Sequence, residues 1–61
     1  MADKFALKAR YEELFRTVKS YVDEERDPGG FSGQLREAME ALKAADPFAN
    51  VREGEELLKR A

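Results

Sequence analysis

The sequence predicts an all-helical domain, folded as a helical hairpin with one long N-terminal helix and a broken second arm of two shorter helices. Three observations lead to this prediction. The first 26 residues carry apolar side chains at steps of three and four, the spacing of one helix face. Asp27-Pro28 and Asp46-Pro47 divide the rest of the chain into two further segments. No stretch alternates apolar and polar residues as a half-buried strand does.

The long helix is expected over residues 3–26, with Asp3 as its N-cap and good helix formers nearly throughout. At 1.5 Å per residue it would measure about 36 Å. Its apolar residues fall within an arc of about 120°, so the helix has one face to bury. This apolar stripe consists of Leu7, Tyr11, Leu14, Phe15, Val18, Tyr21 and Val22.

A loop is expected over residues 27–31, where a proline and two glycines form the strongest helix breaker in the chain. The second helix is predicted over residues 32–45, with Ser32 as a fair N-cap. Its inward face would carry Leu35, Ala38, Met39, Leu42 and Ala45.

The third helix follows a break at residues 46–49, and two starting points compete for it. Asp46 could cap a helix with Pro47 in its first turn, or Asn50 could cap one with Glu53 three residues later. We prefer the second start and predict a helix over residues 50–60. Gly54 weakens it, and its inward residues would be Val51, Leu57 and Leu58.

Composition narrows the possible functions. The 61 residues allow one domain, 1–61, and contain neither cysteine nor histidine, so the sequence predicts no disulfide, metal site or cofactor. Thr17, Ser20 and Ser32 stand in no nucleophile motif, so we expect no enzymatic activity. The first residues lack the apolar core of a signal peptide, and no run could span a membrane. We therefore expect a soluble, cytoplasmic protein.

The apolar stripe also predicts a protein partner, because the second arm offers few bulky residues to cover it. Oligomerisation is a common solution for a chain of this size. We expect dimerisation into a helical bundle, with the stripe as the contact surface. Phe5 lies outside the stripe and is a candidate partner anchor, whereas Phe31 and Phe48 are expected to plug the ends of the core.

The charge order of the long helix runs against its dipole, because acidic residues gather at its C-terminal end. Two such helices packed antiparallel would bring opposite charges together across a two-fold axis. Simple hydration of these charges is the alternative, as is intrachain pairing of the basic end with Glu53, Glu55 and Glu56. The interface charges predicted by the first interpretation are Lys4, Lys8, Arg10, Asp23, Glu24 and Glu25.

The predicted function is a non-enzymatic protein–protein interaction or assembly module, such as a small adaptor, chaperone-like protein or accessory subunit. It would bind another protein or a second copy of itself. The alternative is a small DNA-binding regulator of helix-turn-helix type. Nucleic acid is disfavoured because the supposed recognition helix, Val51–Glu56, contains three glutamates and one arginine.

Overall fold

The computed structural model describes residues 3–60, which form three α-helices and no strand. The helices are α1 (Lys4–Asp23), α2 (Gly30–Ala45) and α3 (Arg52–Arg60). The predicted all-helical class is confirmed for this part of the chain. Residues 1, 2 and 61, which the predicted domain 1–61 includes, lie outside the described range.

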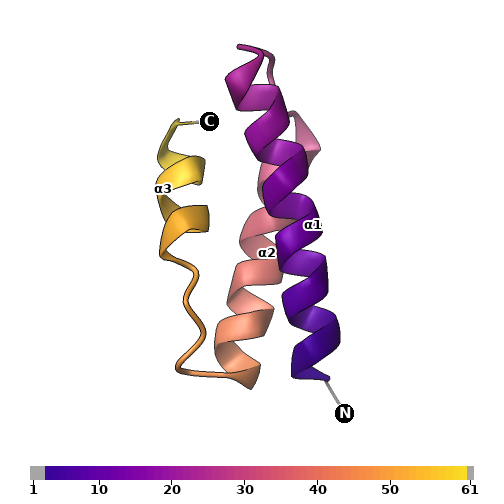
Figure 1. The fold of residues 1–61 in the computed structure, drawn as a ribbon, viewed down its shortest axis with the longest axis vertical. Helices are drawn as coiled ribbons and strands as arrows, with labels where there is room; N and C mark the ends of the chain where they lie inside the picture. Colours follow the sequence, from indigo (N-terminus) through magenta and orange to yellow (C-terminus); the bar gives the residue numbers. More distant parts are fainter. Residues whose placement is uncertain (1–2, 61) are drawn as a thin grey trace.

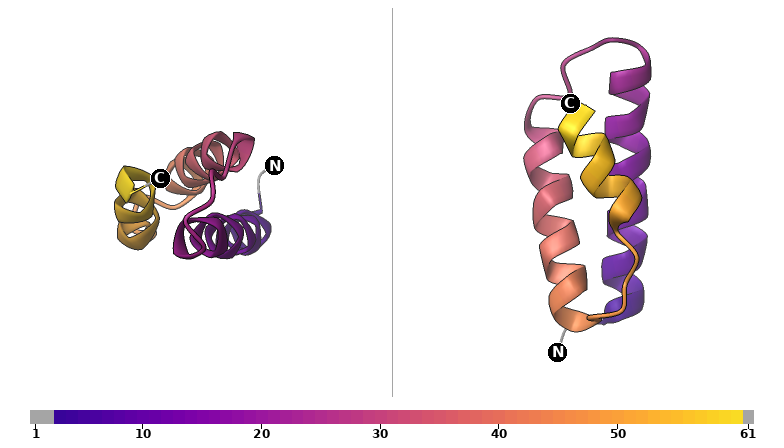
Figure 2. Two further views of the ribbon diagram at one scale, coloured as in Figure 1. Left: turned by 90° about the horizontal axis from the view of Figure 1, so that it is seen from above. Right: turned by 90° about the vertical axis from the view of Figure 1, so that its left-hand side faces the viewer.

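The three helices form an up-down-up bundle with principal extents of 36 × 17 × 14 Å (Figure 1). α2 returns antiparallel to α1, and the chain reverses again at residues 46–51, so that α3 runs alongside both (Figure 2). The predicted second arm, in which the third helix continues the line of the second, is therefore wrong. Folding back lets α3 bury Val51 and Leu57 against α1 and α2.

α1 begins with the predicted cap, since the Asp3 carboxylate accepts a hydrogen bond from the Phe5 backbone N–H at 2.9 Å. It ends at Asp23 rather than at residue 26. Glu25 has a left-handed φ of 57°, and the Arg26 N–H donates to the Tyr21 carbonyl at 2.8 Å. This is the hydrogen-bond pattern of a Schellman motif, which closes the helix three residues before the predicted end.

α2 starts at Gly30, two residues earlier than predicted, and Ser32 lies inside the helix rather than at its cap. Gly29 holds the N-cap position with φ 60° and ψ −131°, a conformation that a residue without a Cβ adopts readily. The Asp27 carboxylate accepts a bond from the Gly29 N–H at 3.0 Å and closes the preceding turn. The predicted Ser32 cap is therefore wrong, because α2 begins at a glycine and no side chain caps its first turn.

The connection from α2 to α3 contains two side-chain turns. Asp46 lies in extended backbone before Pro47 and accepts a bond from the Phe48 N–H at 3.1 Å. The resulting turn does not continue into a helix. Asn50 repeats the arrangement, accepting from the Arg52 N–H at 3.2 Å, and α3 follows from Arg52 rather than from residue 50.

One apolar core joins the three helices. Val18 and Leu35 are fully buried at its centre, and Phe31 closes one end, where its ring lies 5.6 Å from that of Tyr21. Ala45, predicted to face inward, is exposed because α2 ends there and the chain turns away. No described helix is long and apolar enough to cross a membrane. The buried apolar residues are Tyr11, Leu14, Val18, Leu35, Ala38, Met39, Leu42, Val51 and Leu57.

Candidate functional site

The apolar stripe of α1 lies largely within the core of the single chain. Tyr11, Leu14 and Val18 are buried, and the other four members are half-buried between α1 and its neighbours. α2 and α3 both pack against α1. A partner therefore cannot reach the centre of the stripe without displacing a helix. The half-buried members are Leu7, Phe15, Tyr21 and Val22.

Phe5 is 72% exposed, as expected for a residue outside the stripe. Its ring lies 5.8 Å from the Lys4 ammonium, a cation–π contact at the surface of the first turn of α1. Phe5 therefore contributes little to the core and is available for contact with another molecule.

The predicted interface charges divide into two groups. Two of those at the C-terminal end of α1 have partners in the same chain: Asp23 lies 3.3 Å from Lys19, and Glu24 lies 3.8 Å from Arg26. In residues 3–60, no ion pair within 4 Å involves the predicted basic residues or Glu25. The basic end of α1 thus carries charges that residues 3–60 do not pair. These basic residues are Lys4, Lys8 and Arg10.

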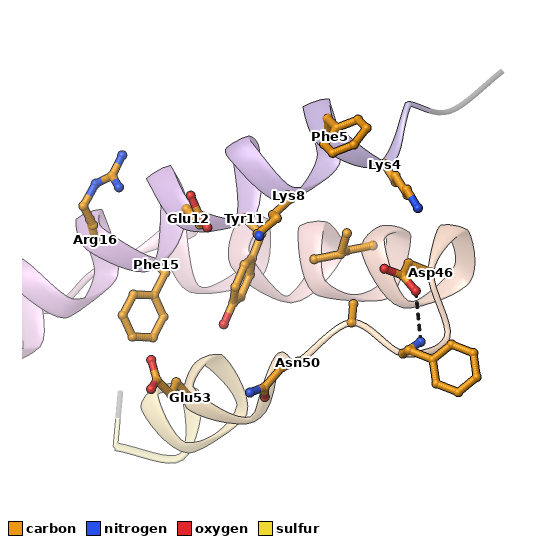
Figure 3. Close-up of a pocket in the computed structure, with 13 residues that line it drawn as sticks. Lys4, Phe5, Lys8, Tyr11, Glu12, Phe15, Arg16, Asp46, Asn50 and Glu53 are labelled. Atoms are coloured by element: carbon orange, nitrogen blue, oxygen red, sulfur yellow. Dashed lines mark hydrogen bonds between the residues drawn. The ribbon is translucent and has the colours of Figure 1, made fainter.

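A groove of about 590 Å³ opens beside this basic end (Figure 3). One wall is the N-terminal half of α1, and the other is the connection at residues 46–51 with the start of α3. Phe48 lies on this second wall and is 95% exposed. It was expected to plug the core, but the turn closed by Asp46 directs the chain so that Ala49 and Val51 pack inward instead.

Tyr11 and Gly54 meet where α3 packs on α1. The Gly54 N–H donates a hydrogen bond to the Tyr11 hydroxyl at 3.2 Å, in a buried position. A Cβ on residue 54 would lie 2.8 Å from Tyr11 Cε1 and 3.0 Å from Met39 Sδ. Gly54 therefore lets α3 approach closely, a role that outweighs its poor helix propensity.

Burial raises the pKa of the Tyr11 hydroxyl above its usual value of 10.0, because the phenolate would lose hydration. The Gly54 N–H opposes this effect, since it would stabilise the phenolate. The negative charges of Glu53, Glu12 and Glu55 add to the rise. Tyr11 is thus held as a neutral hydroxyl that accepts the backbone bond and supports packing.

The described residues contain no cluster of three or more acidic side chains placed to bind a metal ion. Their buried side-chain nitrogen and oxygen atoms all have hydrogen-bond partners.

A second open hollow of about 500 Å³ lies between α2 and α3, where Lys43 and Glu55 pair at 3.4 Å. The groove itself offers apolar contact with the exposed rings of Phe5 and Phe48.

The geometry gives no support to a helix-turn-helix. That motif joins helices at about 90–120° through a turn of three or four residues. Here residues 46–51 separate α2 from α3, which run antiparallel along the bundle (Figure 2). The first turn of α3 also carries Glu53 and Glu55, whose charges would repel phosphate.

The fold and groove define a small three-helix bundle with an exposed aromatic pair. Comparison with protein-family models, curated proteins and solved structures finds no match for the chain. The functional argument therefore depends on the groove itself.

Proposed function

We propose that the protein is a non-enzymatic interaction or assembly module that binds a protein partner through the groove beside the N-terminal half of α1. The observation that carries this proposal is the exposure of Phe5 and Phe48, 72% and 95%, on opposite walls of one groove. Exposed aromatic rings that flank a hollow are typical of the central contacts of protein interfaces.

The groove also has suitable chemistry around the rings. Lys4, Lys8 and Asp46 add charges at its rim, whereas half-buried Phe15 and Ala49 supply apolar surface inside it. This combination of an apolar centre with a polar rim resembles the composition of a transient protein interface. Of the interface predicted from the sequence, the proposed contact surface retains Phe5. The buried stripe is replaced by the connection between α2 and α3.

A cytoplasmic location and the broad role of adaptor or accessory subunit stay predictions from the sequence. The lack of cysteine agrees with a reducing compartment. The groove favours a protein partner over nucleic acid, because Glu12, Asp46 and Glu53 line it together with the cations.

Site-specific photo-cross-linking tests the proposal. A photoreactive phenylalanine analogue replaces Phe48, with the same analogue at exposed Ala41 on α2 as the control. In native cells, we expect a polypeptide adduct from position 48, its second component identified by mass spectrometry, and none from position 41. No adduct from position 48, or equal labelling at both positions, would reject the groove as a protein-binding surface.

Alanine substitution separates binding from folding. Phe5→Ala and Phe48→Ala should change the free energy of unfolding by less than about 0.5 kcal/mol, since both rings are exposed. Phe5→Ala should reduce the yield of the cross-link made from position 48, and Phe48→Ala should reduce that made by the same analogue placed at position 5. A loss of stability as large as that of a core substitution would instead show that these rings support the fold.

A further inference from the structure

The two walls of the groove carry opposite net charge. On α1, Lys4, Lys8 and Arg16 outnumber Glu12, which leaves this wall at +2. The opposite wall contains two carboxylates and no cation, which leaves it at −2. Figure 3 shows Lys4 and Lys8 leaning from α1 toward the wall formed by the connection and α3. The opposite wall carries Asp46 and Glu53 with the neutral Phe48, Ala49 and Asn50.

These groove charges have no ion-pair partners within the described residues. The four ion pairs of residues 3–60 are Lys19–Asp23, Glu24–Arg26, Lys43–Glu55 and Arg52–Glu56. None of them uses a charged residue that lines the groove. Both walls are therefore free to meet opposite charge on another molecule.

A second copy of this chain supplies that opposite charge. In a two-fold dimer, every contact occurs twice: if one residue of the first copy touches a different residue of the second, the same two residues also touch with the copies exchanged. If the two-fold axis runs along the groove, the basic wall of each copy faces the acidic wall of the other. An axis across the groove would place like charges together. The charge distribution thus favours a two-fold axis that runs along the groove.

We propose that the groove is the interface of a homodimer, with Lys4 and Lys8 of one copy opposite Asp46 and Glu53 of the second. The same symmetry brings Phe5 of each copy toward Phe48 of the other. This inference depends on the proposed function and names its partner. It replaces the predicted antiparallel pairing of two long helices, because α2 and α3 cover the stripe and intrachain partners occupy Asp23 and Glu24.

The available area indicates a weak dimer. An aromatic side chain buries about 150–250 Å² when fully covered, so two exposed rings supply at most about 300–500 Å² of the ~800 Å² per partner in a standard interface. The lysine stems and the half-buried Phe15 and Ala49 contribute the remaining contacts. The result is at the small end of specific interfaces, where complexes are transient.

A reciprocal charge exchange tests the dimer by sedimentation velocity across a concentration series. Lys8→Glu places a carboxylate opposite Glu53 of the second copy and leaves the α1 wall with no net charge. Glu53→Lys places a cation opposite Lys8 of the second copy and leaves the other wall with no net charge. Each variant alone should associate about tenfold more weakly than the natural chain, since its dimer contains two like-charge contacts. An equimolar mixture should form a heterodimer at close to the natural affinity, because both contacts become complementary.

Arg36→Glu, which makes a similar charge change at an exposed site outside the groove, is the matched control and should leave association unchanged. Thermal melts establish that each variant folds. A natural chain that stays monomeric at millimolar concentration, or a mixture that associates no better than its components, would overturn the homodimer. The cross-linking at position 48 distinguishes this failure from that of the proposed function, since an adduct with a different polypeptide would retain the groove as an interface.

Discussion

Replacing Gly54 by alanine adds one methyl group where α3 packs tightly against Tyr11 and Met39. Helix propensity alone would favour the change by about 0.8–1.0 kcal/mol. The new Cβ, however, would lie 2.8 Å from Tyr11 Cε1, 2.9 Å from its hydroxyl and 3.0 Å from Met39 Sδ. These distances are too short for carbon, so α3 or the Tyr11 ring must move.

The cost of that movement has two parts. Overpacking a well-filled core costs about 1–3 kcal/mol. Separating α3 from Tyr11 also weakens the hydrogen bond from the Gly54 N–H, whose net value is about 0.5–1.5 kcal/mol. After the gain in propensity is subtracted, Gly54→Ala should destabilise the protein by roughly 0.5–3.5 kcal/mol. For a domain of this size, each kcal/mol lowers the Tm by about 4–8 °C.

Gly33→Ala provides the matched control. Gly33 also lies inside a helix, but a Cβ there would meet no atom within 4 Å. This variant should be more stable than the natural chain by up to about 1 kcal/mol. Urea titrations followed by far-ultraviolet circular dichroism compare the two. A Gly54→Ala variant that is as stable as Gly33→Ala would refute the assignment of Gly54 as a close-contact residue.

Three further substitutions test the helix end, the buried tyrosine and the core. Glu25→Gly should raise the free energy of unfolding by about 1 kcal/mol and so raise the urea midpoint, because glycine accepts the left-handed φ of 57° without strain; a lower midpoint would contradict this. Stability should fall as pH rises above 10, since the raised pKa of Tyr11 means that the unfolded chain releases the proton first; Tyr11→Phe should reduce this dependence. Leu35→Ala should cost about 2–5 kcal/mol in chemical denaturation, since Leu35 is fully buried, and a loss below about 1 kcal/mol would show a loosely packed core.

Apolar periodicity and capping residues are sufficient to predict the three helices and the N-cap of α1. The periodicity of residues 7–22 predicts a buried helix face, and its members Tyr11, Leu14 and Val18 are in the core. Asp3 caps α1 because the rule needs only a carboxylate two residues before an unpaired N–H. The same local chemistry leaves open which of Asp46 and Asn50 starts a helix, since both side chains accept such a bond.

Features that depend on packing between helices could not be predicted in the same way. Glu25 takes a left-handed conformation that glycine usually adopts, and a glutamate at this position does not predict that conformation. The reversal at residues 46–51 follows from burial of Val51 and Leu57, which requires the positions of α1 and α2. Exposure of Phe48 is a consequence of that reversal. Gly54 was a partial signal, because a glycine inside a short helix often marks a close approach.

The up-down-up order places each helix beside its neighbours in sequence, with short connections between them (Figure 1). Chains with such local topology fold in microseconds to milliseconds, because little loop entropy is lost before native contacts form. Each copy can therefore fold before it meets another, without threading segments between chains. Subunits joined through the groove would then exchange by simple dissociation, on a much shorter timescale than dimers whose chains must unfold to separate.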